Sequence, residues 1–169
     1  MTDKTHSFSD DGASREGHPE APSRFVTVGG LVDRARVSLS IHGDDLIPEE
    51  VSKILRVTPT KAHRKGELMV SPTTGPMGTR RADAWILESP CKHSQDPATL
   101  TIALLDLLPE DETIWAELAA RARIMLRYGL FLADWNRGFT LPPELVTRIA
   151  RMRASLDIDI YFELEDEPN

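Results

Sequence analysis

The stretch from Arg34 to Glu67, RARVSLSIHGDDLIPEEVSKILRVTPTKAHRKGE, decides the fold class of this chain. Polar and apolar residues alternate from Arg36 to Ile41. Because side chains on a strand alternate between two faces, this period of two predicts a half-buried strand. The sequence Gly43-Asp44-Asp45 ends the strand, since Gly tolerates unusual dihedrals and Asp bonds its own nearby backbone.

A short helix is predicted after this turn. Pro48 suits its first position, because the N–H group that proline lacks would be unpaired there anyway. Glu49 and Glu50 place negative charge in the first turn, where it complements the helix dipole. The buried stripe is predicted to consist of Val51, Ile54 and Leu55. Residues 61–66, KAHRKG, then predict a basic loop before the next strand.

The rest of the chain predicts further strands and helices that pack onto this first unit. Strands are expected at 67–71, 83–89, 124–132 and 157–162, helices at 97–108, 110–122 and 141–153, and a hairpin loop at 72–81. We therefore expect an α+β fold with a mostly antiparallel sheet and helices packed on one face. The order of elements contains a split βαβ, ferredoxin-like core with an extra C-terminal helix and strand.

Three segments carry a resemblance to a known family. They are GDDLIPEEVSKILRVTPTKAHRKGE (43–67), the tryptophan strand AWILES (84–89) and LPPELVTRIARMRASLDIDIYF (141–162). With these pieces in order, the chain from Arg34 to Phe162 resembles an uncharacterised bacterial family, domain of unknown function 4279. The resemblance implies a compact α+β domain in a bacterial cytoplasm. It implies no activity, although some relatives are suspected of being immunity or interaction proteins.

The composition predicts one domain flanked by two tails. A chain of 169 residues is long enough for a core of its own. Residues 1–23 and the acidic residues 163–169 hold too little apolar surface to offset the entropy of ordering, so both are predicted to be disordered. The domain is expected to span 24–162, with a short extra strand near Phe25–Val28.

The charge and the cysteine content exclude several classes of protein. A net charge of -7 argues against sequence-independent nucleic-acid binding and against an anionic membrane surface as partner. One cysteine, Cys91, permits no internal disulfide and fits a reducing compartment. The chain shows neither the apolar segment of a secretory signal nor a run of the roughly 20 apolar residues that a membrane span requires. We therefore expect a soluble cytoplasmic protein.

Asp157 and Asp159 are the best candidates for chemistry. Residues two apart on a strand lie roughly 6.5–7 Å apart on the same face. The pair could hold a divalent cation together with Asp44 or Asp45, or act as carboxylates in acid/base catalysis. The alternative is a solvated face on which Arg36 neutralises one of them. Because no fixed-spacing metal or nucleotide motif is present, we assign no catalytic residue, metal or cofactor.

Two hypotheses for function follow. The first is a small protein-interaction module, with an immunity-type inhibitor as one form of it, because an acidic inhibitor suits a basic toxin. The second is a metal-dependent or acid/base enzyme that uses Asp157 and Asp159. Trp85 is predicted to pack in the core or to face a ligand, and Trp135 to be exposed near a turn. The candidate binding residues are Asp44, Asp45, Trp85, Trp135, Asp157, Asp159 and Tyr161, and the oligomeric state stays open.

Overall fold

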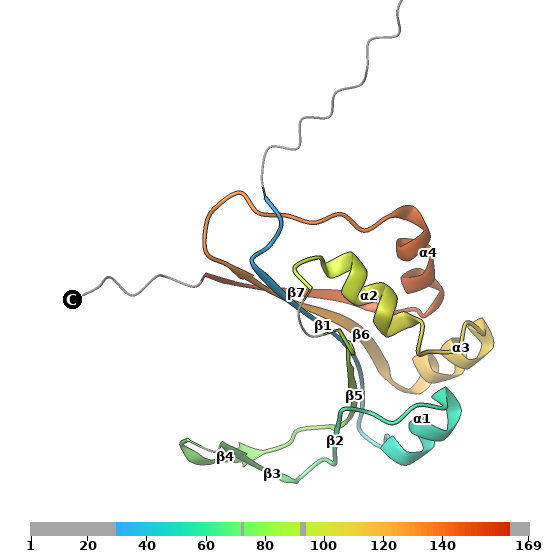
Figure 1. The fold of residues 1–169 in the computed structure, drawn as a ribbon. Helices are drawn as coiled ribbons and strands as arrows, with labels where there is room; N and C mark the ends of the chain where they lie inside the picture. Colours follow the sequence, from blue (N-terminus) through green and yellow to red (C-terminus); the bar gives the residue numbers. More distant parts are fainter. Residues whose placement is uncertain (1–29, 72, 92–93, 163–169) are drawn as a thin grey trace, which may run out of the picture.

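The structure is a computed structural model that describes residues 30–71, 73–91 and 94–162. Its strands are β1 (Arg34–Gly43), β2 (Lys61–His63), β3 (Leu68–Ser71), β4 (Gly75–Thr79), β5 (Asp83–Glu88), β6 (Arg123–Leu132) and β7 (Ser155–Phe162). Its helices are α1 (Pro48–Leu55), α2 (Pro97–Leu105), α3 (Glu112–Arg121) and α4 (Pro143–Arg151). Figure 1 shows their arrangement.

Five strands form one sheet in the order β2-β5-β1-β6-β7, and β3 and β4 form a separate hairpin. β1 lies at the centre and pairs antiparallel with β5 and β6. The pair β6·β7 is parallel, and α4 makes the crossover between these strands. The predicted α+β class and the mostly antiparallel sheet are confirmed.

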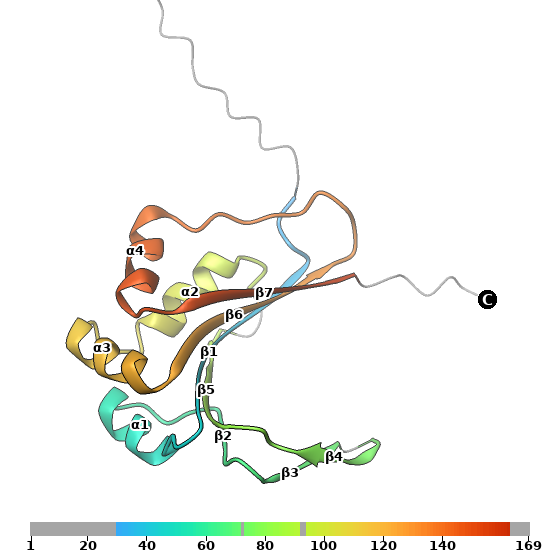
Figure 2. The same ribbon diagram turned by 180° about the vertical axis from the view of Figure 1, so that it is seen from behind.

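The helices all lie on one side of the sheet, as Figures 1 and 2 show from opposite directions. The strand faces that point toward them supply the core. Leu39 and Ile41 of β1 and Leu126 of β6 are fully buried there, together with Trp115 of α3. Apolar burial against the helices therefore explains the period of two on β1 and β6, which the alternation predicted.

Local signals place the starts of two helices. Asp96 accepts hydrogen bonds from the backbone N–H groups of Ala98 and Thr99 at 3.1 Å each, so it caps α2. Asp111 accepts one from the N–H of Thr113 at 2.9 Å and caps α3. Each cap contacts N–H groups only two or three residues away, so both helix starts depend on the local sequence.

Two predicted loops were wrong in part. Residues 61–63 of the basic loop form β2, which pairs antiparallel with β5. The hairpin loop at 72–81 contains β4, whose two glycines, Gly75 and Gly78, have positive φ angles. Both strands are short and exposed, so neither shows the alternation of apolar residues that marks a strand in a sequence. The possible strand near Phe25–Val28 and the two predicted tails lie outside the described residues.

Candidate functional site

The sheet face that the helices leave uncovered is the candidate site. Because the strands are in register, its side chains form rows across β1, β6 and β7. The rows are Ser38–Arg127–Asp157, Arg36–Gly129–Asp159 and Arg34–Phe131–Tyr161. We call this surface the open face. It brings basic, aromatic and acidic side chains together from three strands that are distant in the sequence.

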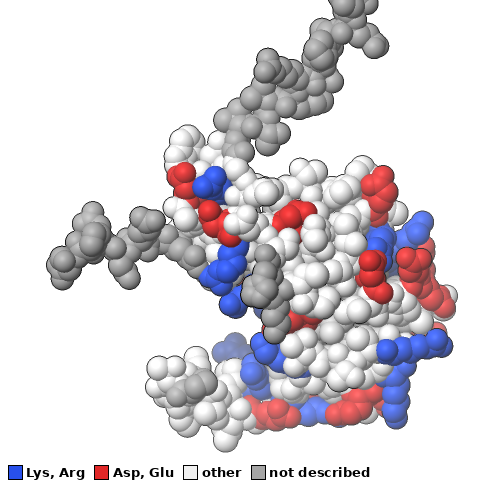
Figure 3. Space-filling model, in the orientation of Figure 1, with Lys and Arg blue, Asp and Glu red and all other residues white. Residues whose placement is uncertain are grey.

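A hollow of about 580 Å³ lies over the open face. Its lining includes Arg34, Arg36, Ser38, Lys61, Glu88, Cys91, Arg127, Phe131, Asp159 and Tyr161. Figures 1 and 2 show the β3–β4 hairpin extending from the sheet on the side opposite the helices. Figure 3 shows a notch between this hairpin and the rest of the molecule, with Lys and Arg side chains along its walls. The hollow is therefore a basic recess beside a projecting arm.

Aromatic rings and arginines stack at one end of the open face. The rings of Phe131 and Tyr161 lie 5.0 Å apart at an interplanar angle of 16°. The Cζ atom of Arg34 lies 3.7 Å from the centre of the Phe131 ring, and that of Arg36 lies 5.4 Å away. Both distances suit a cation–π contact, which holds the guanidinium groups over the ring.

Gly129 makes room for this stack. A Cβ atom on Gly129 would lie 3.7 Å from Phe131 and 3.9 Å from Tyr161, so both rings reach over the backbone of that residue. A larger side chain at this position would compete with the rings for the same space. The stack of Phe131 and Tyr161 therefore depends on a residue with little or no side chain between their strands.

The charges on the open face are only partly neutralised. Arg127 pairs with Asp157, and the Nζ atom of Lys61 lies 2.7 Å from Oε1 of Glu88. The guanidinium of Arg36 forms no ion pair or hydrogen bond with another described residue, and its nearest ring contact is Phe131. Arg36 therefore offers its donors to solvent or to a ligand.

Two histidines on the same side of the sheet have lowered pKa values. The pKa of His42 is lowered by partial burial first, and then by the nearby charges of Arg127, His63 and Arg123. The pKa of His63 is lowered by burial and by Arg80, although Glu67 and Asp83 oppose the shift. Positive neighbours disfavour the imidazolium form, so both rings are held toward the neutral state.

The β3–β4 hairpin adds an apolar arm to the recess. Leu68, Val70 and Met77 are 70%, 66% and 66% exposed. The hairpin pairs only within itself among the described strands, and an isolated two-stranded ribbon has little stability of its own. Large apolar side chains that stay in solvent on such an arm are typical of a surface that contacts another molecule.

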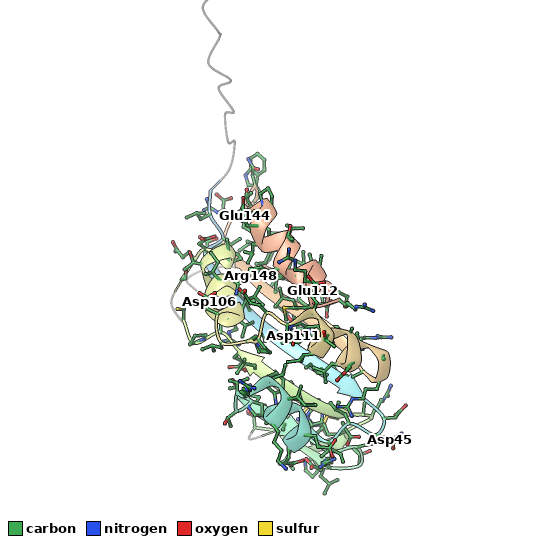
Figure 4. All side chains as sticks on the ribbon, turned by 90° about the vertical axis from the view of Figure 1, so that its right-hand side faces the viewer. Asp45, Asp106, Asp111, Glu112, Glu144 and Arg148 are labelled. Atoms are coloured by element: carbon green, nitrogen blue, oxygen red, sulfur yellow. The ribbon has the colours of Figure 1, made fainter. Side chains whose placement is uncertain are left out.

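Several carboxylates lie on the opposite side of the molecule. Figure 4 looks onto the helices and shows Asp45, Asp106, Asp111, Glu112 and Glu144 on that layer. Arg148 of α4 pairs there with Asp106 at 2.8 Å and approaches Glu110 at 3.9 Å. Arg148 thus finds its partners on the segment between α2 and α3. The net charge of -7 therefore does not describe the open face.

The predicted site residues fall into separate regions. Asp157, Asp159 and Tyr161 share the open face, as their alternation predicted. Asp44 lies beyond the far end of β1 and pairs with Lys65 at 2.9 Å, a contact that lowers the pKa of the Asp44 carboxyl. Seven residues of β1 separate Gly43 from the row of Asp159, which corresponds to roughly 20 Å. The structure therefore does not bring Asp44 or Asp45 together with the β7 pair.

Neither of the two tryptophans predicted as site residues lines the recess. Trp85 is fully buried, and its Nε1 atom donates to the Ser52 hydroxyl at 3.0 Å. Trp135 is exposed on the segment after β6, as predicted. Residues 30–71, 73–91 and 94–162 contain no group of three or more His, Cys, Asp or Glu side chains placed to hold a metal ion.

The sequence reasoning missed Arg34 and Phe131 as site residues. Arg34 continues the polar alternation of β1 by one residue pair, and Phe131 belongs to the less apolar face of β6. Both signals were present, but nothing in the sequence says that these two faces are the same face of one sheet. Strand pairing supplies that information.

Comparisons with known proteins identify a family and nothing more specific. The family model described as Domain of unknown function (DUF4279) matches residues 33–163. No curated protein and no solved structure matches the chain. In the described part of the chain, every helix is too short or too polar to cross a bilayer.

Proposed function

The chain belongs to the DUF4279 family, and from that premise we propose that it is a small protein-interaction module that binds its partner on the open face. The observation that carries the proposal is the cluster of Arg36, Phe131 and Tyr161 on an uncovered sheet. Arginine and aromatic side chains are enriched at protein interfaces and dominate their binding energy. Such residues in a recess of about 580 Å³ give a partner a place to anchor.

The charge of the recess indicates the chemistry of the partner. Arg36 has no carboxylate partner among the described residues, and the Lys and Arg side chains around it make the surface attractive to carboxylates. The exposed apolar residues of the hairpin suit an apolar flank on the same partner. We therefore propose an acidic segment with neighbouring apolar side chains as the bound element.

An immunity-type role in the bacterial cytoplasm is part of this proposal. The sequence favoured a basic toxin on the strength of the net charge of -7. Figure 4 shows several carboxylates on the helix layer, whereas the charged side chains that line the recess are mainly Lys and Arg. A target bound on the open face would instead present acidic groups.

Enzymatic use of Asp157 and Asp159 receives less support. Arg127 donates to Asp157, which removes one of the two carboxylates from the pair. The Asp159→Asn variant still separates the two functions, because an interaction module keeps its fold and shows no lost turnover.

The test is site-specific capture of the partner. A photoreactive amino acid replaces Ser38 in the recess, and in a control chain it replaces Ile102, which is exposed on α2. We expect the Ser38 position to form a crosslink with one protein from a host lysate and the Ile102 position not to. Arg36→Glu should abolish the crosslink, whereas Lys53→Glu, the same charge change on α1, should not.

Three outcomes would count against this function. A crosslink that Arg36→Glu leaves intact places the contact elsewhere. A crosslink that disappears after nuclease treatment means that nucleic acid, and not protein, occupies the recess. Equal crosslinks from Ser38 and Ile102 mean that the capture is unspecific.

The ferredoxin-like core also stays a proposal. Its support is the order of strands and helices along the chain, in which β1, α1, β5, α2 and β6 alternate. A solved structure of this chain or of another family member, compared with known ferredoxin-like folds, would test it.

A further inference from the structure

Besides the open face, the outer edge of β7 is a second surface with no described partner. β7 pairs with β6 on one side, and no described strand pairs with it on the other. It runs over eight residues, whereas the opposite edge strand, β2, has three and carries Lys61. Proteins protect sheet edges with short strands and lysines, because an open edge can template pairing with another chain. Among the described strands, one edge is protected in that way and the outer edge of β7 is not paired.

The helix layer does not cover the apolar side chains of β7. Leu156, Ile158, Ile160 and Phe162 are 47%, 47%, 57% and 65% exposed. Their neighbours in the sheet rows, Leu126, Tyr128, Leu130 and Leu132 of β6, are all buried. The apolar face of the sheet thus continues onto β7, where the helices no longer cover it. An occupant of this edge must supply both a strand and apolar side chains on one face.

We infer that a second copy of this chain occupies the edge, with the two β7 strands antiparallel about a two-fold axis between their Ile160 residues. An axis perpendicular to the sheet keeps the open faces of both copies on the same side. Each residue then lies opposite a residue of the same face, so apolar positions meet apolar positions and polar positions meet polar ones.

The aspartates select this register. An axis at Asp159 would place two carboxylates opposite each other, and an axis at Ile158 would place Asp157 opposite Asp159. Like charges directly opposite on neighbouring strands are destabilising. An axis at Ile160 places Asp159 opposite Tyr161 and Ile158 opposite Phe162, so each carboxylate meets a phenol. Residues 158–162 of each copy would pair, and the two five-stranded sheets would become one.

The dimer does not depend on the function proposed for the open face. Arg36 lies on β1, which β6 separates from β7, and the shared axis leaves both recesses on one side. Loss of partner binding by Arg36→Glu is therefore expected without loss of the dimer. Loss of the dimer by a change on β7 tests this inference separately.

Sedimentation of the full chain over a range of concentrations is the test. We expect a monomer–dimer equilibrium, because the paired segment is short. Ile160→Lys should weaken the dimer about tenfold or more, since two lysines would face each other across the axis. Ile102→Lys makes the same change at an exposed isoleucine on α2 and should leave the dissociation constant unchanged.

A mixture of two variants tests the register itself. Ile160→Lys and Ile160→Glu should each be monomeric at concentrations where their equimolar mixture forms a heterodimer, because opposite charges would then meet at the axis. Amide hydrogen exchange of the unaltered protein tests the β7 pairing without any substitution. The β7 amides should gain protection as the concentration rises, whereas the amides of α1 should not.

Several results would overturn the inference. A monomer at every concentration, or a dimer that Ile160→Lys and Ile102→Lys affect equally, excludes pairing through this edge. A dimer that Ile160→Lys weakens, but that the Lys and Glu mixture does not restore, excludes the Ile160 axis. Strong protection in the monomer of the β7 amides that point away from β6 would mean that another segment of the same chain occupies the edge.

Discussion

Arg127 holds Asp157 across the parallel pair of β6 and β7. Its Nε and Nη2 atoms lie 3.0 and 2.9 Å from the Oδ2 atom of Asp157. The two residues are directly opposite in the strand register. This contact gives Asp157 a structural partner and leaves Asp159, in the next row, facing Gly129. The two aspartates therefore occupy different environments, although they are two residues apart on one strand.

Replacing the two aspartates should separate these environments. We expect Asp157→Asn to lower the free energy of unfolding by up to about 1 kcal/mol, the upper range for a partly exposed ion pair. Asp159→Asn should change it by less than about 0.5 kcal/mol. Urea denaturation at low salt measures both, and added salt should shrink the effect of Asp157→Asn. Equal changes in the free energy of unfolding for the two variants would mean that the ion pair between Arg127 and Asp157 does not stabilise the fold.

Gly129 provides a prediction about the aromatic stack. Its φ angle lies outside the left-handed region, and a Cβ atom there would make only ordinary contacts, from 3.7 Å outward. Gly129→Ala should therefore raise the free energy of unfolding by about 0.5–1 kcal/mol, because alanine restricts the unfolded chain. Gly78 has a φ of 127°, so Gly78→Ala should lower it. Chemical denaturation of both variants checks the signs. A loss of stability in Gly129→Ala would show that the rings leave no room for a methyl group.

His42 predicts a dependence of stability on pH. Its pKa is lower in the folded state than the ordinary value of 6.5, mainly because of burial and then because of Arg127. The unfolded chain therefore binds more protons below that value, and the free energy of unfolding should fall as the pH drops from about 7 through the lowered pKa. His42→Asn should flatten this part of the curve, and the remaining slope is expected from His63, whose pKa is also lowered. Denaturation at a series of pH values measures it, and an unchanged slope in His42→Asn would contradict the prediction.

The β3–β4 hairpin should be dispensable for folding. Its base is closed by hydrogen bonds from the N–H of Arg80 to the carbonyl of Glu67 at 2.8 Å and from the N–H of Gly66 to the carbonyl of Arg80 at 2.9 Å. A chain in which a Gly-Gly linker replaces residues 68–79 should keep the circular dichroism and melting behaviour of the intact protein. The same chain should lose the crosslink from Ser38, because the arm borders the recess. A collapsed fold would show instead that the hairpin stabilises the sheet.

The sequence by itself determined the features that depend on near neighbours in the chain. The alternation on β1, β6 and β7 predicted both the strands and the faces of their side chains, because a strand exposes its two faces in turn. The predicted helix at 97–108 begins where α2 begins, because its cap, Asp96, contacts N–H groups only two and three residues away. The family resemblance and the α+β class rested on the same local patterns and were confirmed.

Only the tertiary structure decided which of these faces meet. One alternative paired Arg36 with one of the two β7 aspartates, but β6 lies between β1 and β7, and Arg127 of β6 pairs with Asp157. Strand order depends on which apolar faces pack best under the helices, and the pattern within a single strand does not record it. The open face is the consequence. Its arginines, aromatic rings and carboxylates come from three strands and become one surface only when β1, β6 and β7 pair.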